Sequence, residues 1–379
     1  MRKILYLSGT RADYGLMQRS LKAIEKHPDL TLEVAATGMH MMADHGMTVE
    51  EIRKDGFVLH ELPITYEGDT RTGMAKFVGE CVKAFVEVCE KTQPDVILLL
   101  GDRGEMLAGA IAGAYMGIAV AHIHGGEVTS TIDESARHAI TKLAHIHFPA
   151  TEESAERIRR MGEQPSTVYV VGAPGLVGID KELFGDTEIR ERLNLNPKGP
   201  FAMLLQHPVS QEVALAEGHI GASLEALKEM EIPAVVIYPN ADAGGRAMIG
   251  VIESYRDDPA FSIHAHINRR EFLSLMKHAA VMIGNSSSGI IEAPSFHLPV
   301  VNLGTRQEGR QRGENVIDND YGKDSVKEGM KKALYDRLFL DNLHSSVNPY
   351  GDGKTDVRIA KLLTEIEVSD GLLQKKLAY

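Results

Sequence analysis

The chain has 379 residues, of which 43% are hydrophobic and 25% charged. This length exceeds what usually folds around one hydrophobic core, so two domains are predicted. Its 53 acidic and 41 basic residues give a formal net charge of -12, which argues against general nucleic-acid binding and against binding to an anionic membrane. The two cysteines match no metal or redox spacing and no apolar run reaches the ~18 residues of a membrane span, so a cytoplasmic protein without disulfides is expected.

Short apolar, β-rich runs alternate with longer amphipathic stretches along the first half of the chain. Amphipathic helices are predicted at residues 15–27 and 76–91, and the second contains both Cys81 and Cys89 as buried helix residues. This alternation is typical of a parallel sheet covered by helices. Strands are predicted at residues 3–8, 32–37, 95–100, 118–123 and 146–150.

The alternation resumes after residues 168–180, where the chain is predicted to pass from one sheet to a second. Two Rossmann-like α/β domains facing each other across a cleft are therefore predicted, at residues 1–170 and 171–357, followed by a helical segment at 358–379 that can pack back on the first domain. Ligands of open α/β sheets bind beyond the carboxyl ends of the strands, so functional residues are sought there. The strands of the second set are predicted at residues 200–206, 234–238, 261–266, 281–284 and 299–303.

Two loops that lead from a strand into a helix are candidate phosphate sites. Residues 8–15 follow the first strand, and free N–H groups at the helix start together with Arg11 can bind a phosphate; an ordinary strand-to-helix turn is the alternative. This loop lacks the G-x-G-x-x-G pattern of dinucleotide-binding domains. Residues 284–289 offer hydroxyl and backbone donors at a second helix start, where a serine can also serve only as the cap. The candidate diphosphate ligands there are Ser286, Ser287, Ser288 and Gly289.

Further candidates for nucleotide binding follow the other strands of the second domain. Glu292, one turn after the serines, can accept the two hydroxyls of a ribose. Arg306 lies in a basic loop, residues 304–312, that can bring guanidinium groups to the same edge of the sheet as the serines. The alternative is an ordinary basic loop exposed to solvent. His207 and Asn240 follow two more strands; we expect the histidine to act as a cation or acid near a phosphate leaving group, and the asparagine to bind a ligand edge.

Acid and base side chains gather after neighbouring strands of the first domain. Asp102 directly follows a buried apolar run, and His124 and Glu127 follow the next one. Asp133 stands at the start of a helix, where it can also be an N-cap. Because proton transfer needs a base and an acid in different environments, this grouping predicts a proton-transfer site. His122 and His124 alternate along a strand and point to opposite faces, so no metal site is expected, and His122 is interpreted as a packing residue.

Taken together, nine motifs resemble the hydrolysing UDP-N-acetylglucosamine (UDP-GlcNAc) 2-epimerases of bacterial sialic and legionaminic acid biosynthesis, over residues 1 to 363. The resemblance implies a glycosyltransferase-B type fold with the nucleotide on the C-terminal domain. It also implies a homodimer or homotetramer that needs no cofactor, eliminates UDP from UDP-GlcNAc through a 2-acetamidoglucal and adds water to release free N-acetylmannosamine. The motifs lie at residues 9–15, 37–41, 101–105, 124–127, 133–145, 207–208, 240–244, 284–295 and 304–310.

By position, the resemblance assigns proton transfer to Asp102 and Asp133, and UDP departure to His207. Many members of the family carry Glu where this chain has His124; either this histidine is the base, or Glu127 takes over, or the change marks another sugar such as UDP-N,N'-diacetylbacillosamine. Two hypotheses of other classes are a glycosyltransferase and a non-catalytic UDP-sugar sensor. The nucleotide contacts that the resemblance implies are Arg11, Arg103, Asn240, Ser286, Ser287, Glu292 and Arg306.

Overall fold

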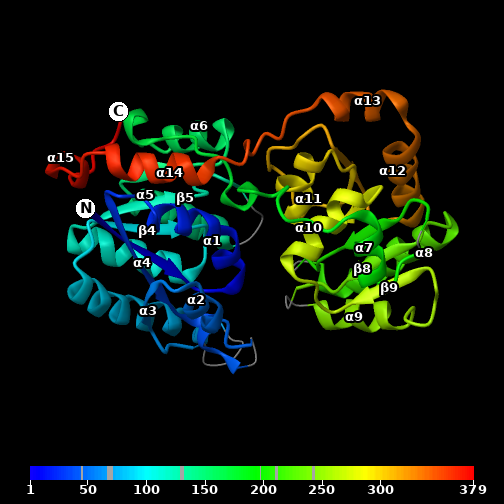
Figure 1. Ribbon diagram of the computed structural model, residues 1–379, viewed down its shortest axis with the longest axis horizontal. Helices are drawn as coiled ribbons and strands as arrows, with labels where there is room; N and C mark the ends of the chain where they lie inside the picture. Colours follow the sequence, from blue (N-terminus) through cyan, green and yellow to red (C-terminus); the bar gives the residue numbers. More distant parts are fainter. Residues whose placement is uncertain (44–45, 66–70, 129–131, 197, 210–211, 241–243) are drawn as a thin grey trace. The chain divides into compact units, whose positions relative to one another are not determined.

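The computed structural model describes residues 1–43, 46–65, 71–128, 132–196, 198–209, 212–240 and 244–379, apart from the side chains of residues 71, 132 and 133. The chain forms two compact units: unit 1 contains Met1–Val177 and Tyr350–Tyr379, and unit 2 contains Gly178–Pro349. Figure 1 shows both chain ends in unit 1. The return to unit 1 comes at Tyr350, earlier than the expected residue 358, because this tyrosine is buried and its carbonyl accepts a hydrogen bond from the N–H of Ala173 over 2.7 Å.

Unit 1 is built on six parallel strands in the order β3-β2-β1-β4-β5-β6. Side chains alternate between the two faces of β1, so Ile4 and Tyr6 join one core with α1 and α14, whereas Leu5 and Leu7 join another with α3, α4 and α5. The strands are β1 (Arg2–Ser8), β2 (Leu30–Ala36), β3 (Val58–Glu61), β4 (Val96–Leu100), β5 (Ala119–Ile123) and β6 (Ile146–Phe148). The helices are α1 (Arg11–Glu25), α2 (Val49–Asp55), α3 (Arg71–Thr92), α4 (Gly104–Met116), α5 (Ile132–Leu143), α6 (Glu152–Arg160), α14 (Thr355–Glu365) and α15 (Asp370–Leu373).

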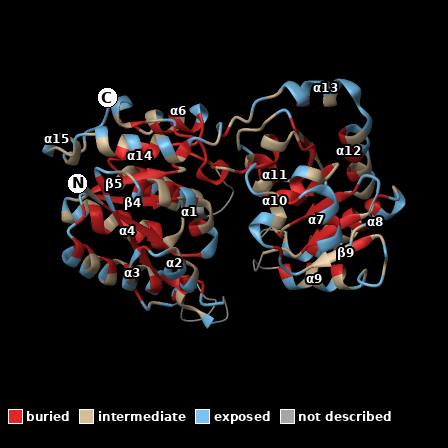
Figure 2. Ribbon diagram, viewed as in Figure 1, coloured by how far each residue is buried: buried red, intermediate tan, exposed pale blue. Residues whose placement is uncertain are grey.

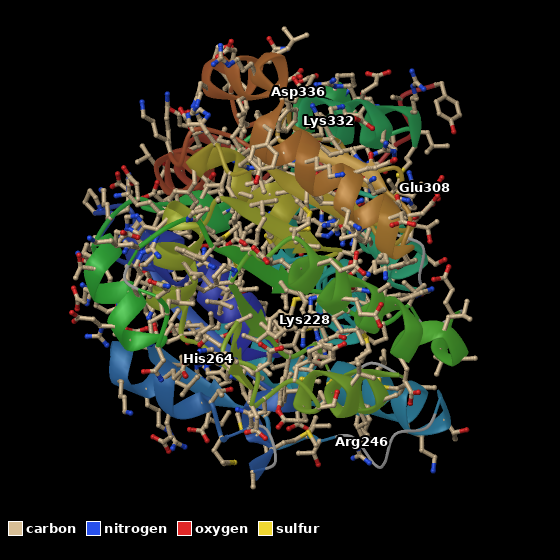
Figure 3. All side chains as sticks on the ribbon, turned by 90° about the vertical axis from the view of Figure 1, so that its right-hand side faces the viewer. Lys228, Arg246, His264, Glu308, Lys332 and Asp336 are labelled. Carbon is tan, nitrogen blue, oxygen red and sulfur yellow. The ribbon has the colours of Figure 1, made fainter. Side chains whose placement is uncertain are left out.

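Unit 2 repeats this architecture with six parallel strands in the order β12-β11-β10-β7-β8-β9. One face of its sheet packs against α8, α9 and α12. Figure 3, which turns unit 2 toward the viewer, marks Lys332 and Asp336 where α12 ends and α13 begins. The strands are β7 (Ala202–Leu205), β8 (Ala234–Ile237), β9 (Phe261–His264), β10 (Val281–Gly284), β11 (Val300–Leu303) and β12 (Val316–Asn319). The helices are α7 (Asp186–Arg192), α8 (Ala216–Glu229), α9 (Gly245–Glu253), α10 (Arg269–His278), α11 (Ser287–Ile291), α12 (Lys323–Tyr335) and α13 (Arg337–Ser345).

Ten strands were predicted, and each of them is present within a few residues of its expected place. The two strands that the prediction missed, β3 and β12, lie at the outer edges of the two sheets. Figure 2 shows that β4 and β5 in the first sheet are buried. On the edge strand β3, in contrast, Val58 is exposed. Cys81 and Cys89 are buried on α3, as expected, and both are free cysteines. Within the described ranges, no helix combines the length and apolar character needed to cross a membrane.

The C-terminal segment is held on unit 1 by the polar contacts of Lys375, which is partly buried. Lys375 donates from Nζ to the carbonyls of Thr141 (3.0 Å), Lys142 (2.7 Å) and Ala144 (2.6 Å), at the C-terminal end of α5. The same ammonium group pairs with Glu163 over 2.7 Å. These contacts satisfy carbonyl groups that a helix end leaves without a partner. Unit 1 therefore includes the last segment of the chain as part of its packed structure.

Candidate active site

The loops after β4 and β5 in unit 1 are joined by one arginine. Arg137 of α5 donates from Nη2 to the carboxylate of Asp102, which follows β4. Its Nη1 donates over 2.9 Å to the backbone carbonyl of Glu127, in the turn after β5. The Arg137 side chain is only 4% exposed, so the bridge is held in a fixed geometry. The prediction did not select Arg137, although its place one turn into a helix that begins with carboxylates was a usable signal.

Two histidines of the β5 region have different environments. His124 has a left-handed backbone, with φ of 61°, and its Nδ1–H donates to a carboxylate oxygen of the buried Glu127. His122 is fully buried; its Nε2–H donates to the carbonyl of Gly101 over 2.8 Å, and its Nδ1 contacts the hydroxyl of Thr141 over 3.2 Å. Burial lowers the pKa of His122 to about 3. His122 is thus a packing residue, as predicted, whereas His124 and Glu127 form a hydrogen-bonded pair.

A buried carboxylate lies beneath the loops that follow β1 and β2. Glu105, in the first turn of α4, is fully buried and pairs with the guanidinium of Arg103 over 3.3 Å. A Cβ added at Gly9 or at Gly38 would lie 2.7 Å from this carboxyl group. Glycine is therefore needed at both positions for the loops to approach Glu105. The sequence does not reveal this role, because the two glycines are distant from Glu105 along the chain.

The loop at residues 8–15 is organised around Asp13. Its carboxylate accepts hydrogen bonds from the N–H groups of Gly9 (3.0 Å) and Thr10 (2.8 Å). The N–H of Asp13 in turn donates to the hydroxyl of Thr10 over 3.2 Å, so Thr10 and Asp13 form a capping box at the start of α1. Burial raises the pKa of Asp13 to about 6, against the hydrogen bonds from Ser8 and these two N–H groups. Arg11, on the exposed side of the loop, pairs with Glu51 over 3.0 Å. The side chain of Asp133 lies outside the described residues.

In unit 2, the loops after β7, β8, β10 and β11 converge around His207 and Asn285. The backbone N–H of Asn240 donates to Nδ1 of His207 over 3.0 Å. Asn285 is fully buried and binds both backbone groups of His207 through its side chain. Its own carbonyl accepts from Nη1 of Arg306 over 3.1 Å and from Nε2 of Gln307 over 2.9 Å. Of the five, the prediction selected His207, Asn240 and Arg306, and it missed Asn285 and Gln307.

The serine-rich loop forms the entrance of the short helix α11. Ser286 is its N-cap and accepts from the N–H of Ser288 over 3.4 Å, while Ser287 and Ser288 are half-buried. Gly289 lies against β11, where an added Cβ would be 2.9 Å from Val300.

The predicted ribose acceptor ends the same helix. Glu292 is its C-cap, is buried and accepts a hydrogen bond from Nη1 of Arg269 over 2.8 Å. That arginine fixes the orientation of the carboxylate. In the described part of the chain, no group of three or more His, Cys, Asp and Glu side chains could hold a metal ion.

Known proteins resemble this chain over nearly its whole length. A sequence profile described as UDP-N-acetylglucosamine 2-epimerase matches residues 22–364. The chain is 43% identical over 381 residues to the UDP-N,N'-diacetylbacillosamine 2-epimerase (hydrolyzing) of Legionella pneumophila, covering 100% of both proteins. It is 35% identical over 335 residues to the UDP-N-acetylglucosamine 2-epimerase of Neisseria meningitidis serogroup B, covering 88% of each.

The fold is similar to that in a crystal structure of UDP-GlcNAc 2-epimerase from Neisseria meningitidis bound to UDP-GlcNAc. The TM-score is 0.83, over 96% of this chain and 100% of that one, at 19% sequence identity. This likeness confirms the predicted fold class, which is two Rossmann-like α/β units of the glycosyltransferase-B type.

Proposed function

The chain belongs to the UDP-N-acetylglucosamine 2-epimerase family, and from this premise we propose that it is a hydrolysing 2-epimerase acting on a UDP-linked 2-acetamido sugar. In the first stage a base removes the proton at carbon 2, the C–H electrons form a carbon 1–carbon 2 double bond, and the carbon 1–oxygen bond breaks to release UDP. In the second stage water adds at carbon 1 of the 2-acetamidoglucal and a proton returns to carbon 2 on the opposite face. The electrons balance without an oxidant or reductant.

The hydrogen-bonded pair of His124 and Glu127 is the observation that carries this proposal. With Nδ1–H bound to the carboxylate, Nε2 of His124 is the ring nitrogen that can take a proton from carbon 2, and Glu127 stabilises the imidazolium that forms. Two of the alternatives left open by the sequence, His124 or Glu127 as the base, combine in this proposal: His124 is the base and Glu127 orients it. The carboxylate that many family members carry at position 124 is replaced by an imidazole backed by a carboxylate.

Asp102 supplies the second acid or base in the proposed reaction. Return of a proton to the opposite face of the sugar requires a group distinct from His124. Asp102 is suited to this task because Arg137 ties it to the turn that carries Glu127. In unit 2, the proposed UDP contacts are His207, Asn240, Arg306, the serines of α11 and Glu292, the last of these for the ribose.

Two substrates are candidates, and the identity values favour one of them. The Legionella pneumophila protein, at 43% identity over both full lengths, is named for UDP-N,N'-diacetylbacillosamine, whereas the Neisseria meningitidis protein, at 35%, is named for UDP-N-acetylglucosamine. We therefore propose a 2,4-diacetamido UDP-sugar as the preferred substrate and UDP-GlcNAc as the second candidate. Comparing kcat/KM for the two sugars decides between them, and a higher value for UDP-GlcNAc would contradict the preference.

Incubation with each UDP-sugar in deuterated water tests the reaction itself. Deuterium is expected at carbon 2 of a free sugar, released together with UDP. Transfer of the sugar to an acceptor, without label at carbon 2, would instead indicate a glycosyltransferase, and binding without turnover of any UDP-sugar would indicate a sensor.

Variants of the pair test the role of its histidine. His124→Gln should lower turnover by about 10²–10⁴-fold, the usual contribution of a general base. His124→Glu should retain much more activity, since a carboxylate can also act as the base. His27→Gln, the same substitution at the end of α1, is the matched control and should leave turnover unchanged. Turnover of His124→Gln equal to that of this control would reject His124 as the base.

A further inference from the structure

The protonation pattern of His207 is set by the backbone around it. The N–H of Asn240 donates to Nδ1 of the ring over 3.0 Å. A backbone N–H can only donate, so Nδ1 must carry a lone pair, and the single proton of a neutral imidazole then lies on Nε2. The tautomer of His207 thus follows from a contact in which only one donor arrangement is possible.

Asn285 holds the main chain of His207 on both sides. Its Oδ1 accepts from the N–H of His207 over 2.7 Å, and its Nδ2 donates to the carbonyl of the same residue over 2.9 Å. Asn285 is itself buried, and Arg306 and Gln307 donate to its carbonyl. Turning the ring over would break the hydrogen bond to Asn240, so the fixed backbone keeps Nε2 as the nitrogen available to a ligand.

The surroundings of the ring oppose a positive charge on it. Burial, and after it the positive charge of Arg306, lower the pKa of His207 to about 3. Tyr321, whose hydroxyl accepts from Asn285 over 3.4 Å, stays neutral because burial raises its pKa. Among the described residues, Arg306 is the charged group that acts on the ring. The imidazole is therefore neutral at the pH of a cell.

Resting on the function proposed above, we propose that His207 is a neutral donor, which gives a hydrogen bond from Nε2–H to a phosphate oxygen of the departing UDP, and that Asn285 is the positioning residue that fixes it. This replaces the cation or acid expected from the sequence. When the carbon 1–oxygen bond breaks, its electron pair goes to the diphosphate oxygen. A diphosphate is stable as an anion and can leave without receiving a proton. Fixed donors that face the developing charge are therefore sufficient.

Three substitutions of His207 separate a donor from an acid and from a structural anchor. Gln places an amide N–H near the position of Nε2, Asn places an acceptor near the position of Nδ1, and Ala offers neither. A neutral donor predicts that His207→Gln keeps kcat within about tenfold of wild type, whereas His207→Asn and His207→Ala lose about 10²–10³-fold, as expected for one donor to a developing oxyanion. An equal loss of kcat in all three variants would indicate that His207 acts as an acid. A higher kcat for His207→Asn than for His207→Gln would indicate that His207 serves only as a structural anchor. Either result overturns the proposal.

Nitrogen NMR of the protein bound to UDP tests the same inference without turnover, so it remains decisive even if the proposed reaction fails. The His207 ring should show an unprotonated Nδ1 and a protonated Nε2 from pH 6 to pH 8. Asn285→Asp, which keeps the acceptor but loses the Nδ2 donor, should mix the two tautomers and lower kcat. A protonated Nδ1 or a doubly protonated ring in the wild type would refute the neutral donor, and an unchanged tautomer in Asn285→Asp would refute the positioning role.

Discussion

Substitution of Glu163 by Gln should destabilise unit 1 by a measurable and pH-dependent amount. Burial alone would raise the pKa of Glu163, but hydrogen bonds from His147, Lys142 and Lys375 outweigh it and lower the pKa from its ordinary value of 4.5 to about 2. The side chain is only 2% exposed, so solvent screens these contacts little. At about 1.4 kcal/mol per pKa unit, the ionised carboxylate contributes about 3 kcal/mol to the free energy of unfolding at pH 7.

Because the pKa of Glu163 is lower in the folded state, this contribution is complete above about pH 4.5 and is lost as the pH falls toward 2. For a unit of roughly 200 residues, about 3 kcal/mol corresponds to a Tm lowered by about 6–12 °C. Scanning calorimetry at pH 7, 5 and 3.5 should show this difference in Tm between the wild type and Glu163→Gln, and the difference should become smaller at the lowest pH. Glu156→Gln, at an exposed ion pair of α6, is the matched control and should shift the unfolding free energy by under about 1 kcal/mol. If the Tm difference for Glu163→Gln equals that of the control, or does not change with pH, the ionised Glu163 does not contribute to stability in this way.

Three further predictions concern the site in unit 1. Gly38→Ala puts a Cβ 2.7 Å from the buried Glu105 and should lower turnover at least ~10-fold. Gly46→Ala is the control, because Gly46 also has a positive φ but an added Cβ would meet no atom within 4 Å. Equal losses of turnover in the two variants would show that the contact with Glu105 is not the cause. Arg137→Lys keeps the charge, but a lysine cannot reach both loops, so kcat should fall about 100-fold. The affinity for UDP, measured by calorimetry, should stay unchanged. A parallel loss of that affinity would count against a role in proton transfer. Asp102→Asn, nearly isosteric, should lower turnover by about 10²–10⁴-fold in the same assay, and unchanged turnover would reject its role.

The central strands were predictable because both of their faces are buried, which requires runs such as the five apolar residues of β4. The edge strands β3 and β12 were missed because one side of each meets solvent, so polar and apolar residues mix along them. The same physics explains the domain count. Two buried sheets leave two separate series of apolar runs in the sequence.

Most residues of the candidate site were selected from the sequence because they lie just after a strand. That rule selected Asp102, His124 and His207, since the carboxyl ends of parallel strands meet at one edge of a sheet. It could not select Glu105 or Asn285, because their importance comes from what lies opposite them after folding: two glycine loops in one case, and the main chain of His207 in the other. A buried polar side chain that binds another loop leaves no periodic signal in the sequence.

Unit 1 is discontinuous, and this has a consequence for how the protein is made on the ribosome. Helix α14, which packs on α1 and contributes Ile359 and Leu363 to the same core, is translated only after the whole of Gly178–Pro349. Translation of this segment at ~5–20 residues per second takes on the order of 10–30 s, and during this time part of the apolar face of the first sheet is uncovered. Unit 2 is continuous and can fold during that interval. The N-terminal unit is thus the later of the two to be completed, although its first strand is the first part of the chain to be made.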